Sequence, residues 1–232
     1  MDLTHRLLAL AEDRTLRAAG SMLNGIVHNL NNPAHALNMQ IELFMKSLHR
    51  DLAGRDASVV ENKCRRLRHI GEDFRNHLEV LSWRGTYCRP QVELVDPVHF
   101  GTWLLQFWRN NLFFKHSMVV DLQVQPSLHV KLIPLALLWC LEEPLSTMTS
   151  AFSNEHVQTE FGMRFEIQRF AENGVFFRMT ILPTSETRDF PVVELEHGEN
   201  MRALSRELGW DLKYSSDNML SVLLTIPGTT RA

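Results

Sequence analysis

The chain has 232 residues, a length that suits one large domain or two small ones. Hydrophobic residues make up 44% and charged residues 22%, the composition of an ordinary folded protein. The net charge of −3, with no long block of one sign, argues against a general electrostatic attraction to nucleic acid or an anionic membrane.

Targeting signals and cysteine spacing point to the cytoplasm. No run of about 18 apolar residues occurs, and Met1–Arg6 does not begin a signal peptide. The three cysteines stand alone with no C-x-x-C spacing, which disfavours a disulfide framework or a structural zinc site. We therefore predict a cytoplasmic protein with reduced thiols.

Residues from about 16 to 83 have helical periodicity and no strand-like alternation. The first helix carries a seam spaced 4, 3, 4, 3, 4, 3, 4, formed by Leu23, Val27, Leu30, Ala34, Leu37, Ile41, Phe44 and Leu48. Residues 51–58 are predicted to form a turn. A second helix follows, with apolar residues at Val60, Cys64, Leu67, Ile70, Phe74, Leu78 and Leu81. The expected product is an antiparallel helical hairpin, assigned with the preceding helix-compatible residues to a domain at 1–84.

A hairpin of two amphipathic helices cannot bury both sides of its seam alone. Pairing two hairpins into a four-helix bundle buries them, so the sequence predicts a homodimer.

The second domain is expected at 91–232, after a linker at 85–90. Asp96 and Pro97 form an N-cap with proline at the first helical position. Helices are predicted after Asp96, over 134–152 and over 198–208. Strands are predicted at 92–95, 118–124, 161–170, 175–182, 211–215 and 220–226, with a hairpin turn at Glu172-Asn173-Gly174. This mostly antiparallel order predicts an α+β protein whose second domain is a two-layer α/β sandwich.

His28 is the candidate reactive residue of the first helix. Helical phase turns Val27 and Leu30 into the bundle and leaves His28, Asn32 and His35 on an outward stripe. Pro33 lacks an N–H and is expected to bend the helix beside His28. An exposed imidazole at such a place suits a nucleophile near pH 7.

The run Gly25-Ile-Val-His-Asn-Leu-Asn-Asn-Pro33 resembles the H-box of two-component sensor histidine kinases. The resemblance implies that His28 is a phosphoacceptor and that Asn32 orients phosphotransfer or a hydrolytic water. Asn29 stands where the family usually has an acidic base. Its amide can orient the ring but cannot accept a proton, so Asn29 is kept as a site residue and the case for a kinase is weakened.

The family resemblance extends to the second domain, which is similar to the kinases' ATPase domain without its nucleotide motifs. Glu143 and Pro144 stand where the family has an Asn-Ala pair, and no Asp-x-Gly-x-Gly occurs anywhere in the chain. A later turn, at residues 196–201, has one glycine where several are needed to approach phosphates. We therefore expect no cofactor of the chain's own.

This combination resembles dimeric histidine phosphotransferases, which relay phosphoryl groups between receiver domains of response regulators. The resemblance implies that the partner receiver supplies Mg²⁺, and that a hybrid histidine kinase is a further partner. Helical geometry suggests a partner-binding surface at Asn24, Met39, Arg75 and Asn76. Three alternatives stay open: a non-catalytic pseudokinase that binds a kinase or regulator, an active kinase, and a regulator phosphatase.

Overall fold

The computed structural model describes residues 2–50, 57–125, 129–153, 160–171, 174–184, 194–216 and 219–228; the side chains of 47–50, 57–59 and 153 are outside that description. The predicted turn at 51–58 therefore lies almost wholly outside the described residues, as do Glu172 and Asn173 of the predicted hairpin turn. The chain divides into two compact units, residues 1–22 with 84–232 and residues 23–83.

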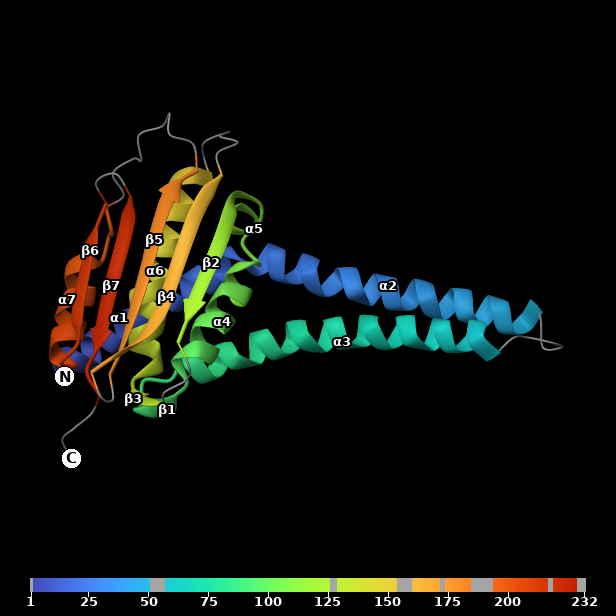
Figure 1. Cartoon of the computed structure of the whole chain (residues 1–232), viewed down its shortest axis with the longest axis horizontal. Coiled ribbons are helices and arrows are strands. Elements are labelled where there is room, and N and C mark those ends of the chain that lie inside the picture. Colours follow the sequence, from blue (N-terminus) through green and yellow to red (C-terminus); the bar gives the residue numbers. More distant parts are fainter. Residues whose placement is uncertain are drawn as a thin grey trace. The chain divides into compact units, whose positions relative to one another are not determined.

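The first unit is an α/β sandwich built on a five-stranded sheet (Figure 1). Its strand order is β2-β4-β5-β7-β6, in which only the β2–β4 pair is parallel. The strands are β2 (Met118–Val124), β4 (Phe161–Phe170), β5 (Gly174–Pro183), β6 (Asp211–Ser215) and β7 (Leu220–Ile226). A separate antiparallel pair joins β1 (Glu93–Val95) to β3 (Val130–Leu132). The predicted α+β class and sandwich are thus confirmed.

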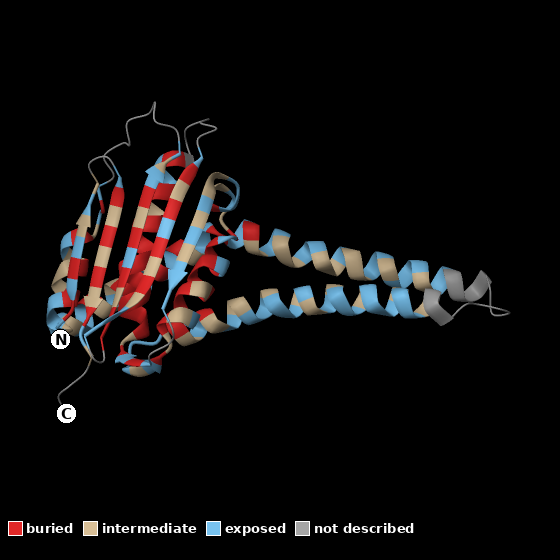
Figure 2. Cartoon of the chain, viewed as in Figure 1, coloured by how far each residue is buried: buried red, intermediate tan, exposed pale blue. Residues whose placement is uncertain are grey.

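Helices cover one face of this sheet, and Figure 2 shows the buried residues concentrated between the two layers. They are α4 (Pro97–Trp108), α5 (Leu112–Ser117), α6 (Pro134–Ser153) and α7 (Gly198–Glu207). Helix α4 begins as predicted: the Asp96 carboxylate accepts hydrogen bonds from the backbone N–H groups of Val98 and His99, and Pro97 opens the first turn. Its aromatic residues lie in the core, including Trp103, Phe107 and Trp108.

Helix α1 (Leu3–Ser21) also belongs to the sandwich unit, where it packs on α6 and α7. Its buried residues Leu7, Ala11, Thr15 and Ala18 follow one helical face. The sequence-based domain at 1–84 placed this segment with the hairpin. The structure groups it with the sandwich instead, because that face is buried against α6 and α7.

The second unit consists of two long antiparallel helices, α2 (Leu23–Arg50) and most of α3 (Ala57–Tyr87) (Figure 1). Helix α3 continues through Gly85 to Tyr87, so the predicted helix end before Gly85 is wrong. Arg84 and Tyr87 are both buried in the sandwich unit, and this packing outweighs the low helix propensity of glycine.

The described part of the hairpin has almost no interior of its own. Of its residues, only Gly25 is buried, and Leu23, Val27 and Ile41 of the predicted seam are 58%, 47% and 43% exposed. The predicted antiparallel hairpin is present, but within one chain its apolar seam stays largely open.

No described helix is long and apolar enough to cross a membrane.

The three cysteines differ in burial, which predicts an order of reactivity. Complete burial raises the pKa of Cys140 to about 12, whereas Cys64 is exposed. Only the thiolate reacts, and at pH 8 the Cys140 thiolate is a negligible fraction. A disulfide reagent at pH 8 should label Cys64 in seconds and leave Cys140 unlabelled until denaturant is added. Mass spectrometry of the labelled peptides gives the order, and native-state labelling of Cys140 alongside Cys64 would contradict this packing.

Candidate functional site

His28 is exposed on α2, as its helical phase predicts. Its ring atom Nδ1 lies 3.4 Å from the side-chain nitrogen of Asn32, one helical turn further along. Within the described part of the chain, Nε2 has no hydrogen-bond partner. One ring nitrogen is therefore held by an amide, while the other is open to a reactant.

Pro33 lies inside α2, five residues after His28. Because proline has no N–H, the backbone carbonyl of Asn29 loses its normal helical donor. Asn29 itself is partly buried. The site thus combines an exposed imidazole with the amides of Asn29 and Asn32, and no carboxylate stands at the position after His28 that could serve as a base.

The four residues predicted to contact a partner all lie on the hairpin unit. Asn24 and Met39 are exposed on α2, and Arg75 and Asn76 are exposed on α3. All four are exposed, and their role in binding stays a prediction.

Helix α6 contains a second set of charged residues, of which only Glu143 was singled out from the sequence. Glu142 and Glu143 are adjacent and almost completely buried. The guanidinium of Arg84, on the last turn of α3, donates to both carboxylate oxygens of Glu142, one of them at 2.9 Å, and to the backbone carbonyl of Thr15 on α1. Arg84 also lies 4.4 Å from the centre of the Phe107 ring.

Burial and pairing act in opposite directions on Glu142. Burial raises the pKa of Glu142 above its usual range, and the neighbouring Arg84 charge and its hydrogen bonds offset part of that rise. The pKa of Arg84 is raised as well: burial lowers it, but the attraction of Glu142 outweighs this effect. The arginine therefore stays protonated at every physiological pH.

Glu143 is held by a second arginine. Arg14 of α1 lies 3.2 Å from a Glu143 oxygen and 3.1 Å from a Glu196 oxygen, so its guanidinium bridges the two carboxylates. Glu143, Glu196 and His197 have ligand atoms close enough together for a metal ion. A cation could bind there only by displacing Arg14, which already neutralises the carboxylates. Pro144 lies inside helix α6, which runs from Pro134 to Ser153.

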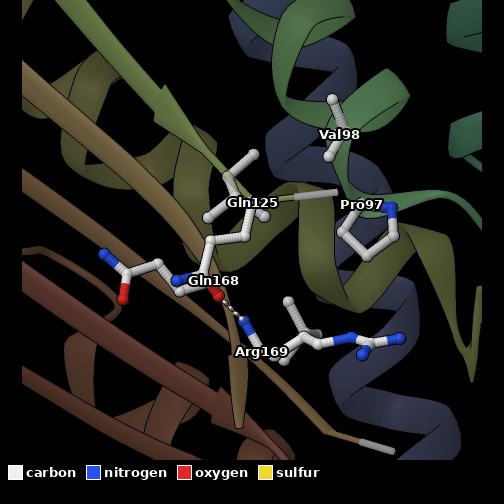
Figure 3. Close-up of a pocket in the computed structure, with 7 residues that line it drawn as sticks. Pro97, Val98, Gln125, Gln168 and Arg169 are labelled. Carbon is white, nitrogen blue, oxygen red and sulfur yellow. Dashed lines mark hydrogen bonds between the residues drawn. The ribbon is translucent and has the colours of Figure 1, made fainter. Parts of the chain in front are cut away.

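One cavity of the sandwich unit is too small for a ligand. It is lined by Pro97, Val98, Gln125, Gln168 and Arg169 with two further residues and measures about 10 Å³ (Figure 3), room for a single water molecule. Two of the residues that line it are joined by a hydrogen bond, which the backbone N–H of Arg169 donates to the side-chain oxygen of Gln125 (Figure 3).

Comparison with known proteins gives matches in structure only. No protein-family model and no curated protein sequence matches the chain. The histidine kinase AdeS of Acinetobacter baumannii is similar over 88% of this chain and 98% of its own, at 12% identity and a TM-score of 0.42. A bacterial phosphotransferase is similar over 90% and 96%, at 13% identity and a TM-score of 0.41. The histidine kinase ThkA, solved in complex with the response regulator TrrA, is similar over 94% and 64%, at 12% identity and a TM-score of 0.41.

The buried Arg84–Glu142 pair predicts a large loss of stability when one partner is removed. Arg84→Ala leaves a buried carboxylate and the Thr15 carbonyl without their donor, which should cost about 3–5 kcal/mol of unfolding free energy. Urea denaturation measures this value. Arg17→Ala is the matched control, because Arg17 is an exposed arginine paired with Asp13, and it should cost less than about 1 kcal/mol. Equal losses in the two variants would contradict the assigned role of the pair.

Proposed function

We propose that the chain is a dimeric histidine phosphotransferase of two-component signalling, which relays phosphoryl groups between response-regulator receiver aspartates through His28. The observation that carries this proposal is the exposed His28 imidazole, with Nδ1 against Asn32 and Nε2 open, inside a run that resembles the H-box. A histidine that served only packing would be buried among neighbours instead.

Asn32 is proposed to set the tautomer of His28. The oxygen and nitrogen of an amide are assigned from hydrogen bonding, so the Asn32 side chain can turn its Oδ1 toward the ring. In that orientation Oδ1 accepts a hydrogen bond from Nδ1–H. The proton then stays on Nδ1, and Nε2 carries the lone pair that attacks phosphorus.

The transfer step follows from this arrangement. Nε2 of His28 attacks the phosphorus of a receiver's aspartyl phosphate in line, so the Nε2–P bond forms as the bond from phosphorus to the aspartyl oxygen breaks. The leaving carboxylate keeps the electron pair. Nδ1 retains its proton, and the positive charge that develops on the ring faces the Asn32 oxygen. A second receiver aspartate then takes the phosphoryl group by the reverse step, with Mg²⁺ bound on the receiver neutralising charge.

Two features support a phosphoryl source outside this chain. Asn29 cannot accept a proton, so the residue after His28 cannot act as the base of an ATP-dependent reaction. On α6, Glu143 is paired with Arg14, and the sequence contains no Asp-x-Gly-x-Gly motif. The sandwich is accordingly proposed to bind no nucleotide of its own.

The open seam of the hairpin supports a homodimer. Leu23, Val27 and Ile41 share the predicted seam and are about half exposed in one chain. A second hairpin with the same seam would cover all three in a four-helix bundle, the usual means by which amphipathic helix pairs gain a core. A second copy of the chain is the partner proposed to cover this seam, because the two surfaces are then identical and self-complementary.

The receiver is proposed to dock on the outer faces of α2 and α3. Met39 follows His28 by eleven residues, three helical turns, and therefore lies on the same side of α2. Asn24, Arg75 and Asn76 add exposed polar and charged groups to the hairpin. Receiver domains, including that of a hybrid histidine kinase, are the partners expected on this surface.

Phosphotransfer is tested with a panel of receiver domains labelled by radioactive acetyl phosphate. His28→Ala should abolish transfer of label to the chain, because no other side chain takes the nucleophile's place. His35→Ala is the matched control, since His35 is also exposed on α2, and it should transfer at the wild-type rate. Wild-type protein that acquires no label from any receiver would refute the relay and leave the pseudokinase. Labelling from ATP alone would identify a kinase.

The dimer is tested by mass in solution. The wild-type chain of 26.8 kDa should run at twice that mass in light-scattering chromatography. Ile41→Asp places a charge in the seam and should give a monomer, because an unpaired buried carboxylate is costly. Leu43→Asp is the control: Leu43 is equally open, at 50% exposed, but two residues away on the other side of α2. A monomeric wild type, or dissociation by both substitutions, would overturn the assigned interface.

A further inference from the structure

Strand β2 is one edge of the five-stranded sheet, and within the described chain it pairs with β4 alone (Figure 1). Just beyond the strand, the backbone N–H of Gln125 donates to the carbonyl of Ile167 on β4 at 3.0 Å. Backbone groups of successive residues in a strand point to opposite sides, so this bond sets the phase of β2. The N–H and C=O groups of Val120 and Leu122 therefore point away from β4, and they have no hydrogen-bond partner among the described residues.

The inward side of β2 is apolar and only partly covered. Its inward residues, whose partners on β4 face the helices, are Met118, Val120, Leu122 and Val124. None of the four is buried, and Val124 is 45% exposed. Their partners on β4 are all buried; they are Phe161, Met163, Phe165 and Ile167. The apolar layer between sheet and helices thus extends to β2, where an added strand with apolar residues at alternate positions would cover it.

The opposite edge of the sheet, β6, is protected against such pairing. Its residues Asp211 and Lys213 form an ion pair at 2.9 Å, and its inward residue Leu212 is buried. Arg202 of α7 lies 4.0 Å from the centre of the Tyr214 ring on the same strand. Charges and covering helices are the means by which sheet edges avoid pairing with another strand. By contrast, β2 has one charged residue in seven, so β2 is the edge that can accept a strand.

The charged residue of β2, Asp121, favours a basic residue on the added strand. Its Oδ2 atom lies 3.4 Å from Nε of Arg164 on β4 and accepts a hydrogen bond from the Gln123 side chain at 2.8 Å. Both contacts use Oδ2, so Oδ1 is left for another cation. A second copy of β2 fits this edge poorly, because antiparallel pairing over all seven residues places Asp121 opposite itself. Charge therefore favours a different segment, with lysine or arginine opposite Asp121.

We propose that the free edge of β2 binds an extended segment of a partner protein as an added strand, with apolar residues at alternate positions and a basic residue opposite Asp121. Hydrogen bonds to the backbone groups of Val120 and Leu122 provide affinity, and the apolar positions cover the inward side of β2. This surface belongs to the sandwich unit alone, and the inference does not depend on phosphotransfer through His28.

Binding to the full chain is measured by fluorescence anisotropy with a labelled probe peptide, Val-Thr-Val-Lys-Val-Thr-Val, blocked at both ends. Its sequence reads the same in both directions, so a parallel or an antiparallel strand presents valines to the inward side of β2 and lysine to Asp121. The control peptide Val-Val-Thr-Lys-Thr-Val-Val has the same composition without the alternation and should bind about tenfold more weakly, or less. Glutamate in place of lysine in the probe should weaken binding about two- to fivefold.

The protein variants locate the site. Val120→Pro removes an N–H that faces the free edge and leaves the hydrogen bonds to β4 in place. It should weaken binding of the probe by about tenfold or more, whereas Val120→Ile keeps the N–H and the apolar side chain and should bind like wild type. Hydrogen–deuterium exchange of residues 118–124 should slow when the probe binds. If Val120→Pro does not fold, Asp121→Asn is measured instead, and it should bind the lysine and glutamate peptides equally.

Several results would overturn this assignment. The proposal fails if the probe does not bind at about 1 mM, if the control peptide binds equally well, or if binding slows exchange elsewhere and not in β2. Equal binding by Val120→Pro and wild type overturns it as well. Light scattering tests the other occupant: self-association of the wild-type chain that Val120→Pro abolishes would assign the edge to a second copy and overturn the proposed partner.

Discussion

The buried ion pair of Arg84 and Glu142 is the constraint that the helices of the sandwich unit share. Two opposite charges removed from water cost several kcal/mol each, and only good geometry recovers that cost. Here the Arg84 guanidinium donates hydrogen bonds to both carboxylate oxygens of Glu142 and to the backbone carbonyl of Thr15. It also lies against the Phe107 ring. Because these partners come from α1, α3, α4 and α6, the pair fixes four elements that lie far apart in sequence.

A different constraint governs the hairpin. The sandwich closes its own core, with fully buried side chains such as Phe165, Phe177 and Leu224 between sheet and helices. The described hairpin buries only Gly25. One unit of the same chain is thus complete, while the other presents an apolar seam and an exposed histidine. This contrast agrees with the proposed relay, in which a second copy would cover the seam and the histidine would stay accessible.

Most of the secondary structure could be predicted, because each element has a local cause. Alternation of apolar and polar residues predicted the bounds of β2 and β6. The N-cap Asp96, followed by Pro97, predicted the start of α4. Heptad spacing predicted the hairpin. The end of α3 and the position of α1 could not be predicted, since they depend on Arg84 and Arg14 meeting glutamates more than fifty residues away. Outward placement of His28 followed from helical phase; its contact with Asn32 required coordinates, and the roles of both stay predictions.

The position of the phosphoryl group tests the central claim most directly. Protein labelled with ¹⁵N-histidine and phosphorylated by a receiver domain should show, by nuclear magnetic resonance, one phosphorus bonded to Nε2 of His28, with Nδ1 still protonated. That result is predicted because Asn32 occupies Nδ1 and leaves Nε2 open. A phosphoryl group on Nδ1, or on any residue other than His28, would contradict the account.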